Sequence, residues 1–300
     1  MTIRQVPNVY PLKTLLEGAE RGDYAVGSFS PRCTPMITPI LLAGEALRSP
    51  LIVQISQREM MWAGLRPSVF AEAFYQQVQA VKPSVPVALH LDHTWEMHII
   101  REAVESGFTS VMIDASSKEL DENIAITREV VAYAHPHGVS VEAELGRIFS
   151  SDDAETESDE ELYTNPEEAE RFVRETGVDA LAVSVGTAHG VYMVRQPKVD
   201  LERLQAIRKR TPVHLVLHGG SGVPEAMMQA AIHLPGGGVS KINIATDLEV
   251  ALLGVLGLPK RIPNEELLTK YAPELPRGAE AVQAVVADKM VNFLGSAGKA

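Results

Sequence analysis

Eight short apolar runs rich in β-branched residues recur along this chain. They cover Ala25–Ser30, Leu51–Ser56, Val85–Asp92, Ser110–Ala115, Ser140–Leu145, Ala180–Gly186, Val213–Gly219 and Lys241–Thr246. Segments with helical spacing lie between them, and strands that alternate with helices form right-handed βαβ units within a parallel sheet. Eight such units predict an α/β fold of the closed (β/α)8 TIM-barrel type, as a single domain over residues 1–300.

The segments between the runs are predicted to form helices. Met97–Glu105 brings three apolar residues to one face, and Glu122–Ala134 repeats apolar residues at helical intervals. A doubly wound sheet is the alternative, but it usually carries a Gly-rich phosphate loop after its first strand, whereas the first run here ends in SFSPRC. Leu248–Ala300 is longer than one closing helix, so we expect a C-terminal helical extension, broken by prolines, that reaches over the barrel or contacts a partner subunit.

Composition narrows the functional classes. With 45% hydrophobic residues among 300, the chain can bury a sizeable core, and its net charge of −12 argues against nucleic acid as a partner, since phosphate backbones require a basic surface. Cys33 is the only cysteine, which excludes an intrachain disulfide and a cysteine metal cluster. MTIRQVPNVY lacks the apolar core of a signal peptide, and no apolar stretch is long enough for a bilayer. We therefore expect a cytoplasmic protein without a membrane partner.

Three histidines follow three of the predicted strands. His93 stands in VPVALHLDHT, His189 in ALAVSVGTAHG and His218 in VHLVLHGGSG. The carboxyl ends of the strands in a parallel barrel form the rim where catalysis occurs. Three imidazoles at this rim, with Asp92 beside one of them, predict a catalytic zinc site that keeps one coordination position open. His90 lies two residues before Asp92, so both face the interior, and we interpret His90 as a neighbour of the metal site rather than a ligand.

Two loops carry residue types that bind phosphate. Gly219–Gly222 follows the seventh predicted strand, and Asn243, Ile244, Ala245 and Thr246 end the eighth. Glycines let backbone amides approach an anion, and the hydroxyls of Ser221 and Thr246 add donors. The loops after the seventh and eighth strands are the recurrent phosphate site of this barrel. A plain turn is the alternative for Gly219–Gly222 alone, but the matching signal in the eighth strand favours a phosphate site.

These motifs together resemble the class II, zinc-dependent ketose-bisphosphate aldolases, the family of the fructose- and tagatose-1,6-bisphosphate enzymes. The resemblance runs nearly end to end, through YAVGSFS, HLDH, GFTSVMIDAS, HGVSVEAELG, TGVDALAVSVGTAHGVY, LVLHGGSG and KINIATD in the family's order. It implies a zinc-dependent aldolase that reversibly cleaves a ketose 1-phosphate or 1,6-bisphosphate to dihydroxyacetone phosphate and an aldehyde. The binding partner is thus a small sugar phosphate, and we expect a homodimer or homotetramer.

The resemblance also implies roles for individual residues. Zinc would bind His93, His189 and His218, with Asp92 as the catalytic acid/base and Asp114 and Glu144 at a secondary metal position. Dihydroxyacetone phosphate would lie on Gly190, Gly219, Gly220, Ser221, Asn243 and Thr246, and we add Ser56, Ile244 and Ala245 to the substrate-binding residues. A monovalent cation would lie near the phosphate, at Ala188, Gly190, Gly219 and Ser221.

The chain departs from the family pattern on the aldehyde side. RIFSSDD replaces the usual Gly-Gly and acidic pair after the fifth strand, so that Asp152 stands where a proton-exchanging glutamate would fall. ISQREMMWAG after the second strand introduces Arg58 and Trp62, and Ala279 replaces an arginine that binds the distal phosphate. We therefore expect an aldehyde other than glyceraldehyde 3-phosphate. The alternative is that Arg58 pairs with Glu59 or another surface acid.

Several interpretations stay open. Ser150–Glu161, SSDDAETESDEE, is either a solvated acidic loop or an active-site lid. A metal-dependent hydrolase would usually carry His-x-His on its first strand, and a non-catalytic sugar-phosphate-binding barrel would have lost Asp92 or a zinc histidine. A Schiff-base aldolase would need a lysine near a strand's carboxyl end, whereas Lys241 is expected at the opposite end of its strand.

Overall fold

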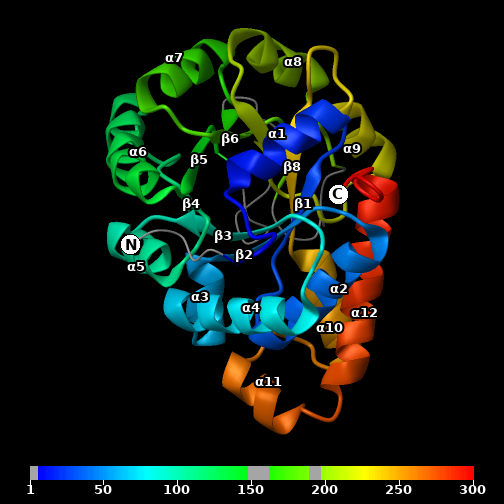
Figure 1. The fold of residues 1–300 in the computed structure, drawn as a ribbon. Helices are drawn as coiled ribbons and strands as arrows, with labels where there is room; N and C mark the ends of the chain where they lie inside the picture. Colours follow the sequence, from blue (N-terminus) through cyan, green and yellow to red (C-terminus); the bar gives the residue numbers. More distant parts are fainter. Residues whose placement is uncertain (1–5, 148–161, 189–196) are drawn as a thin grey trace.

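The computed structural model of this protein describes residues 6–147, 162–188 and 197–300. Eight parallel strands close into a barrel in chain order, and β8 pairs with β1. The strands are β1 Val26–Phe29, β2 Leu51–Ser56, β3 Val87–Thr94, β4 Ser110–Ile113, β5 Ser140–Leu145, β6 Ala180–Val183, β7 His214–Leu217 and β8 Val239–Ile244. The predicted (β/α)8 barrel is confirmed, and the doubly wound alternative is wrong (Figure 1).

Helices form the outer layer of the barrel. They are α1 Leu12–Gly22, α2 Ile37–Leu47, α3 Gln57–Ala63, α4 Pro67–Val81, α5 Met97–Ser106, α6 Leu120–Ala134, α7 Pro166–Thr176, α8 Leu201–Arg210, α9 Glu225–Ile232, α10 Thr246–Leu256, α11 Asn264–Lys270 and α12 Leu275–Asp288. Short 3-10 turns cover Thr34–Met36 and His135–His137, and a π-helical turn covers Lys289–Phe293. The two helices expected from apolar spacing correspond to α5 and α6. None of the helices within the described ranges is long and apolar enough to cross a membrane.

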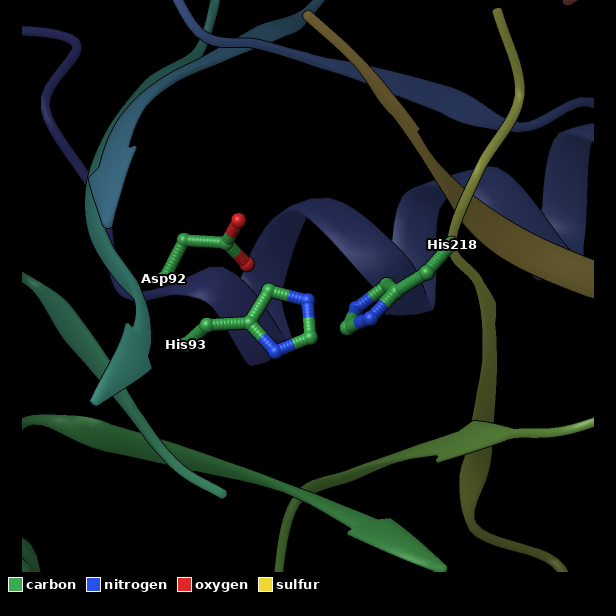
Figure 2. A group of neighbouring side chains, drawn as sticks. All are labelled: Asp92, His93 and His218. Carbon is green, nitrogen blue, oxygen red and sulfur yellow. The ribbon is translucent and has the colours of Figure 1, made fainter. Parts of the chain in front are cut away.

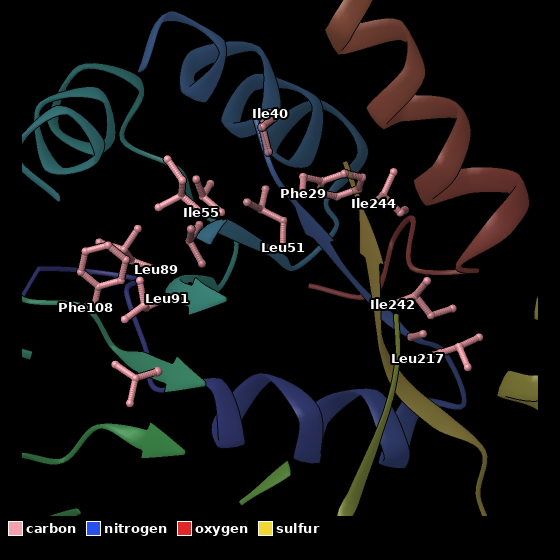
Figure 3. Packing of buried hydrophobic residues seen from close by; sticks show 14 of the residues in the cluster. Phe29, Ile40, Leu51, Ile55, Leu89, Leu91, Phe108, Leu217, Ile242 and Ile244 are labelled. Carbon is pink, nitrogen blue, oxygen red and sulfur yellow. The ribbon is translucent and has the colours of Figure 1, made fainter. Parts of the chain in front are cut away.

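The main hydrophobic core lies between the strands and the outer helices. Phe29 of β1, Leu51 of β2 and Ile244 of β8 point outward from the barrel wall and pack toward Ile40 of α2 (Figure 3). All four side chains are fully buried. Burial of this much apolar surface is the main favourable contribution to folding. Because neighbouring apolar residues point outward, polar residues at alternate positions such as Gln54 and Asp92 face the interior.

The helix α1 closes the amino-terminal end of the barrel. Its Leu12, Leu15 and Leu16 form a second buried cluster with inward-facing strand residues such as Ile52 and Ala88. The helix contacts β1, β3, β7 and β8, and it crosses the barrel in Figure 1. Because this end is filled by apolar side chains, polar groups in the interior can meet a ligand only from the carboxyl-terminal end.

The C-terminal extension packs on the outer wall of the barrel. Its last long helix, α12, contacts α2 and α10 and runs alongside them (Figure 1). Pro263 is the residue before α11. The prolines divide the extension as expected: Pro273 lies between α11 and α12, and Pro276 lies in the first turn of α12, where a missing backbone N–H costs no hydrogen bond.

Candidate active site

Asp92 and His93 are adjacent on β3, yet both contribute to one cluster of side chains (Figure 2). Neighbouring side chains of a regular strand point to opposite faces. Here β3 has one residue more than β4 between its pairings at Leu91 and Thr94, which is a β-bulge. The bulge turns two consecutive side chains toward the carboxyl-terminal mouth. The strand also runs to Thr94, two residues beyond its predicted end.

Asp92 and His93 of β3 come together with His218, the residue directly after β7, although the two segments are far apart in the sequence. Each residue offers a ligand atom, and these atoms all lie within 4.8 Å of one another. The imidazole centroids of His93 and His218 are 4.5 Å apart, with the rings inclined at 65°. Two of the three predicted zinc histidines therefore meet beside the predicted acid/base. The third, His189, lies outside the described residues.

Two further carboxylates border His93. Asp114 places Oδ2 at 2.9 Å from Nδ1 of His93, and Ser116 donates its hydroxyl to the other Asp114 oxygen over 2.7 Å. Oε2 of Glu144 lies 3.2 Å from Nδ1 of His218 and 3.9 Å from Nδ1 of His93. The predicted secondary metal residues, Asp114 and Glu144, thus adjoin His93 as a second possible ligand group. Asp114 also orients the His93 ring, as carboxylates do behind metal-binding imidazoles.

The charges of this cluster favour an added cation. Burial lowers the pKa of His93, but the carboxylates of Asp92, Asp114 and Glu144 outweigh burial and raise that pKa to about 10. Burial and the neighbouring Asp114 hold the pKa of Glu144 well above its usual range. The raised pKa of His93 indicates that the surrounding carboxylates favour positive charge at this point. Imidazole nitrogens together with carboxylate oxygens are donors that zinc accepts, so the described residues fit the metal that the sequence predicts.

Asp92 is held by amides from both sides. Asn243 of β8 donates its Nδ2–H to Oδ1 over 3.0 Å, and Gln54 of β2 donates its Nε2–H to Oδ2 over 3.1 Å. Ser28 of β1 in turn donates its hydroxyl to Gln54. Gln54 is a residue of the candidate site that the sequence interpretation missed. Its signal was a polar residue within the apolar run LIVQIS.

A buried ion pair lies beneath the cluster. Nζ of Lys241 is 2.9 Å from Oε2 of Glu142, and both side chains are fully buried. The expectation that Lys241 opens its strand is wrong, because β8 begins at Val239 and its register shifts by one residue before Lys241. His90 lies 3.7 Å from Glu142 and 3.8 Å from Asp92, inside the barrel as expected. Burial and Lys241 hold the pKa of His90 well below its usual range, so this imidazole stays neutral.

The two predicted phosphate loops meet at the carboxyl-terminal end. Gly220 donates its backbone N–H to the carbonyl of Asn243 over 3.1 Å, and Ser221 accepts from the N–H of Asp247 over 3.3 Å. Thr246 is the first residue of α10, so the positive end of that helix opens at the loops. Gly219 has φ +68°, and a Cβ there would stand 2.2 Å from the carbonyl oxygen of Ala188. A glycine is therefore required where the loop after β7 approaches the segment that follows β6.

The other residues predicted to bind substrate are Ile244, Ala245 and Ser56, and each has a different place in the structure. Ile244 is fully buried in the apolar core and only its carbonyl, which accepts from Ser30 over 3.0 Å, lies at the strand end. Ala245 immediately precedes α10. Ser56 ends β2 and caps α3, where its Oγ accepts from the N–H of Glu59 over 3.2 Å. This hydroxyl is used for the local fold.

The residues that depart from the family pattern make different kinds of contact in the structure. Glu59 binds Arg32 at 2.8 Å, so the alternative pairing of Glu59 with the exposed Arg58 is wrong. The ring of Trp62 lies under the guanidinium of Arg261, at 3.9 Å from its centroid. Ala279 packs against the core on α12. Arg58 is thus the new charged side chain that is exposed beside the end of β2.

Three predicted features lie outside the described residues. They are the proposed zinc ligand His189 with its neighbour Gly190, the proton-exchange residue Asp152, and the acidic segment Ser150–Glu161 that contains it. Their predicted roles stay predictions. Ala188, predicted to bind the monovalent cation, is described and lies against Gly219.

Comparison with known proteins gives consistent matches over nearly the whole chain. The family profile "Fructose-bisphosphate aldolase class-II" matches residues 10–299. The fructose-bisphosphate aldolase of Geobacillus stearothermophilus is 39% identical over 292 residues, which cover 96% of this chain and 98% of that protein. The 6-phospho-5-dehydro-2-deoxy-D-gluconate aldolase of Bacillus subtilis (strain 168) is 40% identical over 291 residues, covering 96% of each.

Solved structures agree with the sequence matches. The crystal structure of the YdjI aldolase from Escherichia coli K12 superposes with a TM-score of 0.81 at 31% identity, covering 97% of this chain and 99% of that one. A putative fructose-1,6-biphosphate aldolase from Coccidioides immitis gives 0.80 at 31% identity, covering 96% and 97%. The similarity therefore extends over the barrel and its C-terminal extension alike.

Proposed function

This chain belongs to the class II fructose-bisphosphate aldolase family, and we propose that it uses a zinc ion on His93, His189 and His218 to cleave a ketose 1-phosphate or 1,6-bisphosphate reversibly into dihydroxyacetone phosphate and an aldehyde. The chain is an aldolase, and hence a carbon–carbon lyase. The observation that carries the proposal is the convergence of Asp92, His93 and His218 at the open end of the barrel. The two alternative functions, a metal-dependent hydrolase and a non-catalytic sugar-phosphate-binding barrel, lose support because the family match and this cluster both favour an aldolase.

Asp92 is the proposed acid/base. Its two oxygens accept from Asn243 and Gln54, which orients the carboxylate beside the histidines. In this position it takes the proton of the substrate's C4 hydroxyl as the C3–C4 bond breaks, and returns it in the condensation direction. Zinc, when bound, supplies a Lewis acid that polarises a carbonyl oxygen. A Schiff-base mechanism is disfavoured, because Lys241 is fully buried against Glu142.

The phosphate of the dihydroxyacetone half is proposed to bind at the two loops after β7 and β8. The hydrogen-bond donors for this phosphate are backbone N–H groups and hydroxyls. They come from the closely spaced backbone at Gly219 and Gly220, the hydroxyl of Ser221 and the start of α10 at Thr246. Gly190 and the carbonyl of Ala188 belong to the same proposed site, together with a monovalent cation. Nearness of Ala188 to Gly219 supports this arrangement.

The aldehyde half is proposed to differ from glyceraldehyde 3-phosphate. Arg58 is exposed next to the end of β2 and does not pair with Glu59, which is held by Arg32. A guanidinium at this position suits an anionic or polyol group on the aldehyde. The matched relatives carry different substrate names, one a fructose bisphosphate and one a phosphorylated gluconate derivative, so substrate identity is not set by family membership.

The proposal also covers the partners, the compartment and the subunit number of the enzyme. The net charge of −12 suits a small-molecule enzyme without nucleic acid or membrane partners. We propose a cytoplasmic homodimer or homotetramer, in keeping with a metabolic aldolase. Size-exclusion chromatography with light scattering tests the subunit number, and a monomer at micromolar concentration would contradict it.

The decisive experiment combines metal content with product release. Purified protein is analysed for zinc, and release of dihydroxyacetone phosphate is followed with a coupled dehydrogenase over a panel that includes fructose and tagatose 1,6-bisphosphates and 6-phospho-5-dehydro-2-deoxygluconate. We expect about one zinc per chain, activity that a chelator removes and zinc restores, and one clearly preferred substrate. Chelator-resistant cleavage, or zinc-loaded protein inactive on the whole panel, would overturn the proposal.

A further inference from the structure

Glu142 of β5 lies directly behind His218, inside the barrel. Its Oε1 is 2.9 Å from Nε2 of His218, and both side chains are fully buried. Lys241 of β8 places Nζ at 2.9 Å from Oε2 and 3.1 Å from Oε1 of the same carboxylate. The three side chains form a chain of contacts from the base of the site to the proposed zinc ligand.

The chemistry of these groups determines where the proton of His218 lies. A lysine ammonium has three donors and no acceptor, so a carboxylate with both oxygens against it acts as an acceptor. Nε2 of His218 must therefore donate to Glu142. A neutral imidazole carries one N–H, which leaves the lone pair on Nδ1. Nδ1 is on the side of Glu144, at 3.2 Å from its Oε2, where His93 also lies.

His93 is held in the complementary way. Asp114 contacts Nδ1 of His93 at 2.9 Å, whereas Glu142 contacts Nε2 of His218. Asp114 therefore lies behind Nδ1 of His93, and Glu142 lies behind Nε2 of His218. The remaining nitrogens, Nε2 of His93 and Nδ1 of His218, are the ones suited to a metal, and Nδ1 of His218 adjoins Glu144, itself a predicted metal-binding carboxylate. The two neighbouring rings therefore need opposite tautomers, which an unsupported imidazole would not maintain.

We propose that Glu142, held by Lys241, is a positioning residue that fixes the Nε2–H tautomer and the orientation of His218, so that Nδ1 faces the metal. This inference rests on the proposed zinc site. Lys241 offsets the charge of Glu142, so that the buried carboxylate holds the imidazole without adding uncompensated negative charge beside Glu144. Lys241 is thereby assigned a structural task in the site rather than covalent chemistry.

Two double variants separate the hydrogen bond from the charge. Glu142→Gln with Lys241→Met removes the ion pair but keeps an amide oxygen that can accept from Nε2–H. Glu142→Leu with Lys241→Met removes the ion pair and the acceptor. We expect the zinc Kd, measured by chelator competition, to be about 10- to 100-fold weaker in the leucine variant than in the glutamine variant, the usual effect of losing such a partner. Equal Kd values in the two would overturn the inference.

Nitrogen-15 NMR of the zinc-loaded unmodified protein tests the tautomer without any substitution. Resonances of His218 are assigned by comparison with His218→Gln. We expect a protonated Nε2 and a metal-bound Nδ1, and metal bound through Nε2 would overturn the inference. For the zinc Kd measurements, the matched control is Asp179→Asn. Asp179 contacts His135 at 2.9 Å and lies just before β6, at the other end of the barrel, so this substitution should leave the zinc Kd unchanged. Absence of zinc binding by the unmodified protein would instead reject the proposed function itself.

Discussion

Asn243 donates a hydrogen bond from Nδ2 to Oδ1 of Asp92 over 3.0 Å. With Gln54 on the other oxygen, the carboxylate is held from β8 and β2 while β3 carries it. Two donors, one on each oxygen, fix the orientation of the carboxylate beside His93 and His218. Asn243 was predicted to bind substrate. In the structure its side chain orients the carboxylate of the proposed acid/base.

Asp92→Ala should retain zinc but lose cleavage by about 10²- to 10⁴-fold, the usual contribution of a positioned proton-transfer group. The physical reason is that the variant keeps the imidazoles and loses the acceptor for the C4 hydroxyl proton. Zinc content and kcat for the preferred substrate are measured on the same preparation. Near-normal turnover with zinc in place would assign the proton transfer to another residue.

His93→Ala, His189→Ala and His218→Ala should each lower zinc stoichiometry and activity together, because each removes one imidazole donor from a site with three. His135→Ala is a suitable control, since His135 pairs with Asp179 and lies away from the cluster. Zinc is measured by atomic emission after dialysis. Full zinc occupancy in all three single variants would reject these residues as the ligands.

Asp152→Ala should abolish solvent hydrogen exchange at C3 of bound dihydroxyacetone phosphate, because Asp152 is the predicted proton-exchange group. The exchange is followed by NMR in deuterated water with zinc-loaded protein. Asp153→Ala is the matched control in the same segment. Unchanged exchange in Asp152→Ala would move the role to Asp153, Glu155 or another group.

Arg58→Ala should change the ranking of aldehydes in the condensation direction, with the largest loss of kcat/KM for acceptors that carry an anionic or polyol group. Arg66→Ala is a control, because Arg66 is exposed and pairs with Glu102 instead. Unmodified protein should cleave fructose 1,6-bisphosphate with a kcat/KM well below that of its preferred substrate. If fructose 1,6-bisphosphate is the best substrate and Arg58→Ala leaves the ranking alone, the aldehyde half is not altered as proposed.

Gly219→Ala should lower the free energy of unfolding by about 1–2 kcal/mol or more, since alanine resists the left-handed conformation and its Cβ would stand 2.2 Å from the carbonyl of Ala188. It should also raise KM for the phosphorylated substrate. Gly254→Ala in α10 is the matched control, because a Cβ there meets nothing within 4 Å, and it should stabilise by about 0.5–1 kcal/mol. Urea unfolding measures both, and a neutral Gly219→Ala would show that the turn tolerates a side chain.

Much of the architecture followed from local chemistry. Apolar runs such as Leu51–Ser56 and Ser140–Leu145 coincide with β2 and β5, because buried parallel strands require continuous β-branched and aliphatic sequence. Gly107 and Gly177 directly follow α5 and α7 and adopt positive φ, the conformation in which a glycine commonly ends a helix. The order and number of these elements predict the closed barrel.

The sequence by itself determined the strands, the helices and the residue types able to bind zinc at strand ends, since these depend on neighbours in the chain. Only the tertiary structure decided which of them meet. The bulge in β3 brings Asp92 and His93 to one cluster, and the register of β8 turns Lys241 inward to Glu142. Such contacts depend on barrel closure and on one-residue shifts between strands, and a shift of one residue reverses the face of a side chain while leaving the pattern of the sequence unchanged.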